Sequence, residues 1–133
     1  MPGSDHEDVL WGVEFLAAVA KGHAPELKDR VLVIGGGNVA IDVSLSALRC
    51  KVKDVTMICL ESKGEMPASP WEIEDTIHEG VIIEPSWGPE EIIIEIMPSP
   101  ACVLSNVPQC LMLKVLFVRF SAMKKWNAKV IRL

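Results

Sequence analysis

Residues Arg30–Asp42 read RVLVIGGGNVAID, and this stretch decides the fold class of the chain. Its first part, Arg30–Ile34, is a short run rich in β-branched residues, which is typical of a strand. Three glycines follow at Gly35–Gly37, and they predict a turn. Beyond the turn, apolar residues recur at helical spacing, at Ala40, Val43 and Ala47. The stretch therefore predicts a strand, a glycine turn and the first part of a helix.

The glycine turn fits the pattern G-x-G-x-x-A, with Gly35, Gly37 and Ala40 at the three fixed positions. In a dinucleotide-binding turn, the first glycine allows the tight bend and the second lets the backbone approach the pyrophosphate. The third small residue lets the helix pack closely on the strand. The N–H groups at the start of the helix then face the anion. The pattern predicts a dinucleotide site, and the alternative is an ordinary βαβ unit whose glycine-rich turn binds nothing.

A second predicted strand, Val55–Leu60, ends at an acidic residue, Glu61. Glu61 lies 24 positions after Gly37. This is close to the offset of about 20 residues expected of the acid that bonds the adenosine ribose. Glu61 is therefore a candidate cofactor-binding residue. The alternative is that its side chain simply points to solvent.

The segments on either side extend this unit. Asp8–Lys21 carries apolar residues at helical spacing, so a first helix is expected there. Ser69–Glu72 is a helix start of the S-x-x-E type, with serine as the cap and proline at the first helical position. That helix is expected to run to about Glu79, and Val81–Glu84 is the third predicted strand. The order β-α-β-α-β predicts an α/β fold, a Rossmann-like doubly wound parallel sheet. We expect this sheet to be incomplete and to be followed by an irregular or β-rich C-terminal tail.

The bulk composition narrows the class of protein. The chain has 133 residues and a net charge of −5, which suits one domain and gives no case for nucleic-acid binding. Its first residues, MPGSDHED, lack the features of a signal peptide, and no apolar run reaches the ~18 residues of a membrane span. We therefore expect a cytoplasmic protein with no membrane partner. The four cysteines and three histidines show no metal-binding spacing, so no metal site is expected.

The character of the sequence changes near residue 90. Five of the nine prolines lie between positions 85 and 108, and Glu95 is the last acidic residue. From position 111 onward there are six Lys or Arg residues and no acid. Three interpretations are open. The tail is a β-rich segment with strands at Ile92–Met97 and Leu111–Phe120, or a basic arm that docks on an acidic partner, or a sequence that is not native to the domain.

The run RVLVIGGGNVAIDVSLSALR, followed by VTMICLESKGEMPASPWEIEDTIHEGV, resembles a known family. It is similar to the NAD(P)H-binding domain of the glutamate synthase small-subunit-like, FAD-dependent pyridine nucleotide oxidoreductases. The match covers roughly Pro2 to Pro89, about two thirds of the chain. The combination of GGGNVAID, EMPA and EIE…EGV is more specific than the glycine pattern alone.

The resemblance implies a cofactor and a partner. In that family, the domain delivers hydride from the nicotinamide to FAD, and electrons go on to iron–sulfur clusters or another subunit. The expected partner is thus an FAD-binding subunit or domain, with an iron–sulfur subunit or domain as a further candidate. Glu65–Ala68 matches a family loop whose role is open. The expected pyrophosphate loop consists of Gly35, Gly36, Gly37, Asn38, Val39 and Ala40.

Two local departures from the family carry predictions. Members that use NADPH typically carry Tyr-Arg-Arg where this chain has Cys59-Leu60-Glu61. A carboxylate at Glu61 can accept hydrogen bonds from the ribose hydroxyls and would repel a 2′-phosphate, so NADH is expected over NADPH. The family's Leu-Gly at the end of the first crossover helix is Cys50-Lys51 here. A non-glycine residue costs about 1 kcal/mol if that site needs a left-handed conformation.

A larger departure concerns what the chain lacks. The sequence has no second glycine fingerprint for FAD, and the family pattern fades after the third strand. We therefore divide the chain into a lead-in helix and linker (1–29), an NAD(P)-binding Rossmann core (30–90) and an atypical tail (91–133). The loss of acids and of resemblance favours a tail that comes from a shifted reading frame or a fused sequence.

Three functions remain open. The first is an NADH-binding module that delivers hydride to an FAD carried elsewhere. The second is a non-catalytic dinucleotide-binding remnant of a truncated or frameshifted gene, and the third is an interaction protein that uses its basic tail. No residue is a convincing nucleophile or general base, so no catalytic residue is named, and the chain by itself is expected to be inactive.

Overall fold

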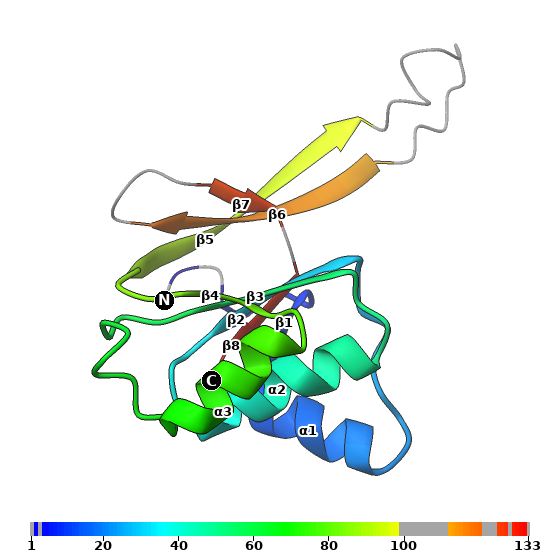
Figure 1. Ribbon diagram of the computed structural model, residues 1–133. Coiled ribbons are helices and arrows are strands. Elements are labelled where there is room, and N and C mark those ends of the chain that lie inside the picture. The colour runs from blue at the N-terminus through cyan, green and yellow to red at the C-terminus, as the bar shows by residue number, and fades with distance from the viewer. Residues whose placement is uncertain (1, 3, 99–111, 121–124, 128, 133) are drawn as a thin grey trace.

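The computed structural model describes residues 2, 4–98, 112–120, 125–127 and 129–132. They form a five-stranded parallel sheet, a layer of helices on one of its faces and a three-stranded antiparallel sheet on the other side (Figure 1). The parallel strands are β1 (Val9–Trp11), β2 (Arg30–Ile34), β3 (Asp54–Ile58), β4 (Ile82–Glu84) and β8 (Lys129–Arg132). The helices are α1 (Gly12–Ala20), α2 (Asn38–Arg49) and α3 (Pro70–His78). The antiparallel strands are β5 (Pro89–Pro98), β6 (Met112–Phe120) and β7 (Lys125–Asn127).

The chain runs β2-α2-β3-α3-β4, which is the predicted β-α-β-α-β order. All neighbours in the five-stranded sheet pair in parallel, in the spatial order β1-β8-β2-β3-β4. The predicted α/β, Rossmann-like class is thus confirmed. The register pairs Ile34 with Ile58, so β2 and β3 end at the same level. Residues that follow these two strands therefore meet at one edge of the sheet.

The core lies between this sheet and α2. The middle of β2 is fully buried, and β3 is buried from Val55 to Ile58. Most of these side chains are branched aliphatic ones, which suits a parallel sheet that is covered on both faces. On the facing side of α2 the buried residues are small, with Ala40, Val43 and Ala47 all at 0% exposure. Small side chains on that face let the helix pack closely on the strand that precedes it.

The predicted first helix is wrong in its first turn. Val9–Trp11 is a strand, β1, and the helix begins only at Gly12. The strand forms because Val9 pairs with Val130 of β8 in the parallel sheet. Local apolar spacing cannot reveal a partner that lies so far along the chain. The predicted end is confirmed, because Gly22 has a φ of 75° and stops the helix.

The predicted start of α3 is right in position and wrong in one contact. Ser69 is the N-cap and Pro70 the first helical residue, as expected. In the part of the chain that the structure describes, however, the Ser69 side chain makes no capping hydrogen bond. The Glu72 Oε2 atom is buried and has no partner among the described atoms, so the reciprocal capping bonds do not form. The backbone, with extended Ser69 followed by proline, fixes the helix start instead.

The tail contributes strands to both sheets. The strands expected at Ile92–Met97 and Leu111–Phe120 are present as β5 and β6, which pair antiparallel, while Leu111 lies outside the described residues. β8 enters the parallel sheet between β1 and β2. The described tail is thus β-rich, one of the two expected forms. Whether residues 91–133 are native to the domain stays a prediction.

Candidate nucleotide-binding site

The glycine turn lies where an open α/β sheet normally binds its ligand. From β2 the chain proceeds to β3 and then β4 on one side, whereas β8 and β1 lie on the other side of β2. The strand order therefore reverses next to β2, and ligands of such sheets bind at that point, beyond the carboxyl ends of the strands. Gly35–Gly37 follows β2 directly and leads into α2.

Gly35 makes the bend out of the strand. Its φ is 151°, in a region that L side chains rarely adopt, so a glycine is required here. Its N–H donates a hydrogen bond of 2.8 Å to the carbonyl oxygen of Ile58, the last residue of β3. The turn is thus tied to the neighbouring strand at its first residue.

Gly36 is a packing residue, which the motif alone does not indicate. A Cβ built on it would lie 2.9 Å from the Cys59 Cβ, 3.3 Å from the Cys59 Sγ and 3.0 Å from the Glu61 Oε2. The turn therefore rests directly on the segment that follows β3. The presence of three successive glycines is the sequence signal for this contact, since G-x-G-x-x-A leaves the middle position free.

Gly37 faces open space. No described atom lies within 4 Å of a Cβ built on it, and its φ of −93° suits any residue. It is the N-cap of α2, but among the described residues no side chain caps this helix, and its first turn contains no acid. An α-helix leaves its first N–H groups without intrahelical partners, and these groups attract anions. The open glycine at this helix start fits an incoming phosphate.

The other residues of the expected loop divide by exposure. Asn38 and Val39 lie on the exposed side of the first turn, whereas Ala40 is fully buried against the sheet. The carbonyl oxygen of Gly37 accepts the 3.2 Å hydrogen bond from the Ile41 N–H that closes this turn. The loop thus has one residue, Ala40, buried against the sheet and two residues, Asn38 and Val39, exposed to solvent.

The structure brings Glu61 to the turn. Glu61 is half-buried, and its carboxylate reaches the Gly36 backbone instead of extending into solvent. Its carbonyl oxygen accepts a 2.9 Å hydrogen bond from Ser86 N–H, and Trp87 N–H donates one of 2.9 Å to the Cys59 carbonyl oxygen. The segment after β4 therefore holds the Glu61 segment in place.

Cys59 lies under this contact as a structural residue. It is 2% exposed, and its thiol donates a 3.6 Å hydrogen bond to the Glu61 carbonyl oxygen. Burial raises the pKa of the Cys59 thiol above its ordinary value, and the Glu61 carboxylate raises it further. The neutral thiol is therefore the favoured form at neutral pH, as expected for a small core residue and not for a nucleophile.

Three further observations concern the described residues as a whole. No group of three or more His, Cys, Asp or Glu side chains within them could hold a metal ion. A cavity of about 290 Å³ lies between the loop after Glu61 and α3, lined in part by Lys63, Met66 and Ile73. It contains none of the predicted site residues. Over the same described residues, no helix has the length and apolarity needed to cross a bilayer.

Curated proteins resemble the chain over a little under two thirds of its length. The NADP(+)-dependent formate dehydrogenase subunit beta of Moorella thermoacetica is 40% identical over 85 residues, 63% of this chain and 12% of that protein. The NADPH-Fe(3+) oxidoreductase subunit beta of Geobacter sulfurreducens is 34% identical over 84 residues, again 63% of this chain and 12% of that protein. The chain thus spans about an eighth of the length of these relatives. No protein-family model matches it.

Solved structures share the fold over the whole chain. An FAD-dependent pyridine nucleotide-disulphide oxidoreductase from Desulfovibrio vulgaris has a TM-score of 0.63 at 14% identity, covering 100% of this chain and 31% of that chain. The water-forming NADH oxidase of Lactobacillus brevis, bound to NADH, has a TM-score of 0.59 at 15% identity, covering 100% and 26%. Its engineered NADPH oxidase variant, bound to NADPH, gives 0.59 at 16% identity, covering 100% and 27%.

Fold and comparisons together define a class. The chain is related in sequence to beta subunits of NAD(P)H-dependent oxidoreductases. It shares its fold with an FAD-dependent pyridine nucleotide-disulphide oxidoreductase and with a water-forming NADH oxidase. Membership of the glutamate synthase small-subunit-like subfamily stays a prediction.

Proposed function

We propose that this chain is the NAD(H)-binding module of a flavin-dependent oxidoreductase. It presents NADH to an FAD carried by a partner subunit or by another part of a longer protein. The observation that carries the proposal is the contact of Gly36 with Glu61 beside the open helix start at Gly37. An acid next to a helix start with free N–H groups supports this proposal, because a dinucleotide site needs a group that bonds the ribose beside a backbone that binds the pyrophosphate.

The residues of the turn fit the nucleotide group by group. The first N–H groups of α2 bind the pyrophosphate, which Gly37 allows to approach because no Cβ stands in the way. The Glu61 carboxylate accepts hydrogen bonds from the adenosine ribose hydroxyls. Bound NADH would supply the hydride, and the residues of this chain bind and orient the NADH molecule.

The names of the curated relatives support a partner subunit, and the name of one structural neighbour supports the flavin. Both curated relatives are called subunit beta, which places them in assemblies with other subunits. The structural neighbour from Desulfovibrio vulgaris is described as FAD-dependent. We extend this pattern to an FAD-binding partner here, with an iron–sulfur subunit or domain as the following electron acceptor.

We also propose that the site prefers NADH over NADPH. The two curated relatives are named for NADP(+) and NADPH, so the preference rests on Glu61 and not on sequence similarity. A carboxylate beside the ribose repels a 2′-phosphate, since two like charges would meet. The Lactobacillus brevis enzyme supports this reasoning. Its five replacements on the way to an NADPH oxidase remove an aspartate and add two arginines.

Titration of the purified chain with NADH and NADPH, followed by nicotinamide fluorescence, tests the proposal. We expect NADH to bind about tenfold more tightly, a difference of about 1.4 kcal/mol. Glu61→Arg should reverse the preference, and Glu61→Gln, which keeps the shape but removes the charge, should lie between the two. Equal or tighter NADPH binding by the unmodified chain would contradict the NADH preference.

The same titration tests the function itself. If neither nucleotide binds, the dinucleotide site is wrong. If NADH binds but a separate assay shows no reduction of a flavin-containing partner, the non-catalytic alternative is favoured.

A further inference from the structure

We infer that Met66–Ala68 is a brace that positions the glycine turn for the nucleotide. This inference deepens the proposed function and rests on it. The segment lies in the loop between β3 and α3, and none of its side chains is assigned to bind the cofactor. Its role is to hold the Gly36 backbone in the shape that the pyrophosphate requires.

The brace contacts the turn through the backbone. The N–H of Ala68 donates a 3.2 Å hydrogen bond to the carbonyl oxygen of Gly36. Gly36 is thus held from two directions, since its other side packs on Cys59 and on the Glu61 carboxylate. Gly36 is therefore contacted both by the loop residue Ala68, which precedes α3, and by Cys59 and Glu61, which follow β3.

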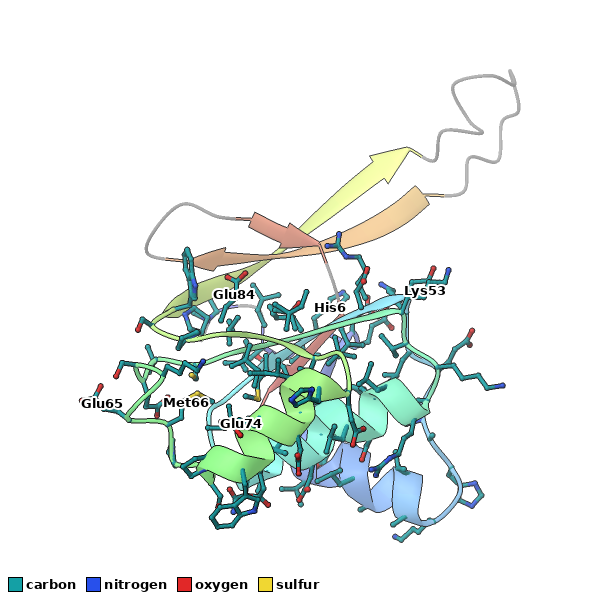
Figure 2. All side chains as sticks on the ribbon, in the orientation of Figure 1. His6, Lys53, Glu65, Met66, Glu74 and Glu84 are labelled. Atoms are coloured by element: carbon teal, nitrogen blue, oxygen red, sulfur yellow. The ribbon has the colours of Figure 1, made fainter. Side chains whose placement is uncertain are left out.

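Buried side chains anchor the brace. Met66 is 8% exposed and Ala68 is 4% exposed, and both belong to the core cluster that includes Ala40 at the start of α2. Glu65 and Pro67 are exposed, so the segment from Glu65 to Ala68 alternates between solvent and core. Figure 2 shows Glu65 extending away from the body of the molecule next to Met66. The anchoring thus comes from the two inward residues.

The ends of the loop are also fixed. Glu65 N–H donates a 2.9 Å hydrogen bond to the Ser62 carbonyl oxygen, which forms a turn before the brace. After it, Ser69 is extended and Pro70 begins α3. Because both ends are held, the position of the Ala68 N–H follows from the packing of Met66 and Ala68.

The turn needs such support because it cannot hold its own shape. Glycine has more backbone freedom to lose than any other residue, and Gly35–Gly37 are three in succession. Among the described residues no side chain caps the helix that follows them. If the brace orders the Gly35–Gly37 backbone when the chain folds, the conformational entropy of these glycines is already lost before the nucleotide binds. Binding then does not have to supply that free energy. Loosening the brace should therefore weaken binding more than an equally destabilising change elsewhere in the core does.

Three variants of the full chain separate positioning from stability. Met66→Ala removes the larger anchor, and Met66→Leu restores an apolar side chain of similar volume. Val55→Ala is the matched control, because Val55 is 1% exposed and lies at the opposite end of β3 from the site. Binding is measured with ADP-ribose, which contains the pyrophosphate but no nicotinamide. The free energy of unfolding is measured for each variant in urea.

We expect Met66→Ala to bind ADP-ribose about tenfold more weakly, equivalent to about 1.4 kcal/mol. Val55→Ala should lose less than twofold, and Met66→Leu should bind like the unmodified chain. An equal loss of affinity in Met66→Ala and Val55→Ala, at a similar loss of stability, would overturn the brace and leave a purely structural role.

Amide hydrogen exchange on the unmodified chain keeps the inference testable if Met66→Ala does not fold. The Ala68 N–H should be protected without ligand, and its protection should increase with ADP-ribose. Exchange at the rate of a free amide in both states would overturn the brace. A chain that protects Ala68 but fails to bind ADP-ribose would instead contradict the proposed function.

Discussion

Near each end of α2 one residue has a positive φ, Gly35 at 151° before the helix and Lys51 at 64° after it, but only the first of these is a glycine. At its N-terminal end the chain supplies three glycines, Gly35–Gly37. At its C-terminal end Lys51 has a φ of 64°, a left-handed conformation that normally favours glycine. Lys51 N–H bonds the Leu48 carbonyl oxygen at 2.9 Å, and Val52 N–H bonds the Ala47 carbonyl oxygen at 3.4 Å. These two bonds form the same helix-ending motif that closes α1 and α3, where the left-handed residue is Gly22 or Gly80.

A costly residue has different consequences at the two ends of α2. At the C-terminal end it lowers only the stability of the fold, whereas at the turn we expect it to affect nucleotide binding as well. A lysine in a left-handed conformation costs about 1–2 kcal/mol, and a folded domain can absorb that cost. At the turn, a side chain would meet neighbouring atoms at Gly36, and at Gly37 it would enter the open space that the proposed site assigns to the phosphate. The helix end therefore tolerates a poor residue, whereas the turn does not.

The largest expected effect is at Gly36. Gly36→Ala would place its methyl group 2.9 Å from the Cys59 Cβ, which lies close to the backbone and cannot turn aside. We expect a loss of about 1–3 kcal/mol in the free energy of unfolding, as for overpacked sites, and a loss of nucleotide binding because Glu61 is displaced. Gly64→Ala is the control, since open space surrounds Gly64. If the two variants unfold at the same urea concentration, Gly36 is not a packing residue.

The next largest effect is expected at Gly37, where a substitution should weaken NADH binding without lowering the stability of the fold. Gly37→Ser adds a side chain where no described atom lies within 4 Å, and serine is a good N-cap for α2. Stability should stay within about 0.5 kcal/mol or improve. Binding of NADH should fall about 10–100-fold, because the hydroxymethyl group occupies the approach to charge-assisted hydrogen bonds of about 1.5–3 kcal/mol. Unchanged NADH affinity in this variant would place the phosphate elsewhere.

These residues also show which features of the fold and the site could be predicted from the sequence. The strand, turn and helix of Arg30–Asp42 are local patterns, and the parallel β2-β3 pair follows from them. The two strands end level, which brings the segment with Glu61 next to the turn, whereas the ribose-binding role that the motif spacing predicts for Glu61 stays a prediction. The motif does not indicate the packing of Gly36 on Cys59 or the bond from Ala68, because both depend on how two loops fold against each other. β1 was missed for a similar reason, since its partner β8 lies near the other end of the chain.

The smallest expected effect returns to the C-terminal end of α2. Lys51→Gly should raise the free energy of unfolding by about 1 kcal/mol, because glycine adopts the left-handed conformation without a Cβ penalty. Lys51 is exposed, so little packing is lost.

Lys51→Ala is the matched control. It removes the same charge but keeps the Cβ, so its stability should stay within about 0.5 kcal/mol of the unmodified chain. At about 1.5 Å per residue, α2 places Lys51 far from the turn, and NADH affinity should not change in either variant. A gain in stability from alanine equal to that from glycine would mean that side-chain or charge effects, and not the backbone, set the cost at this end.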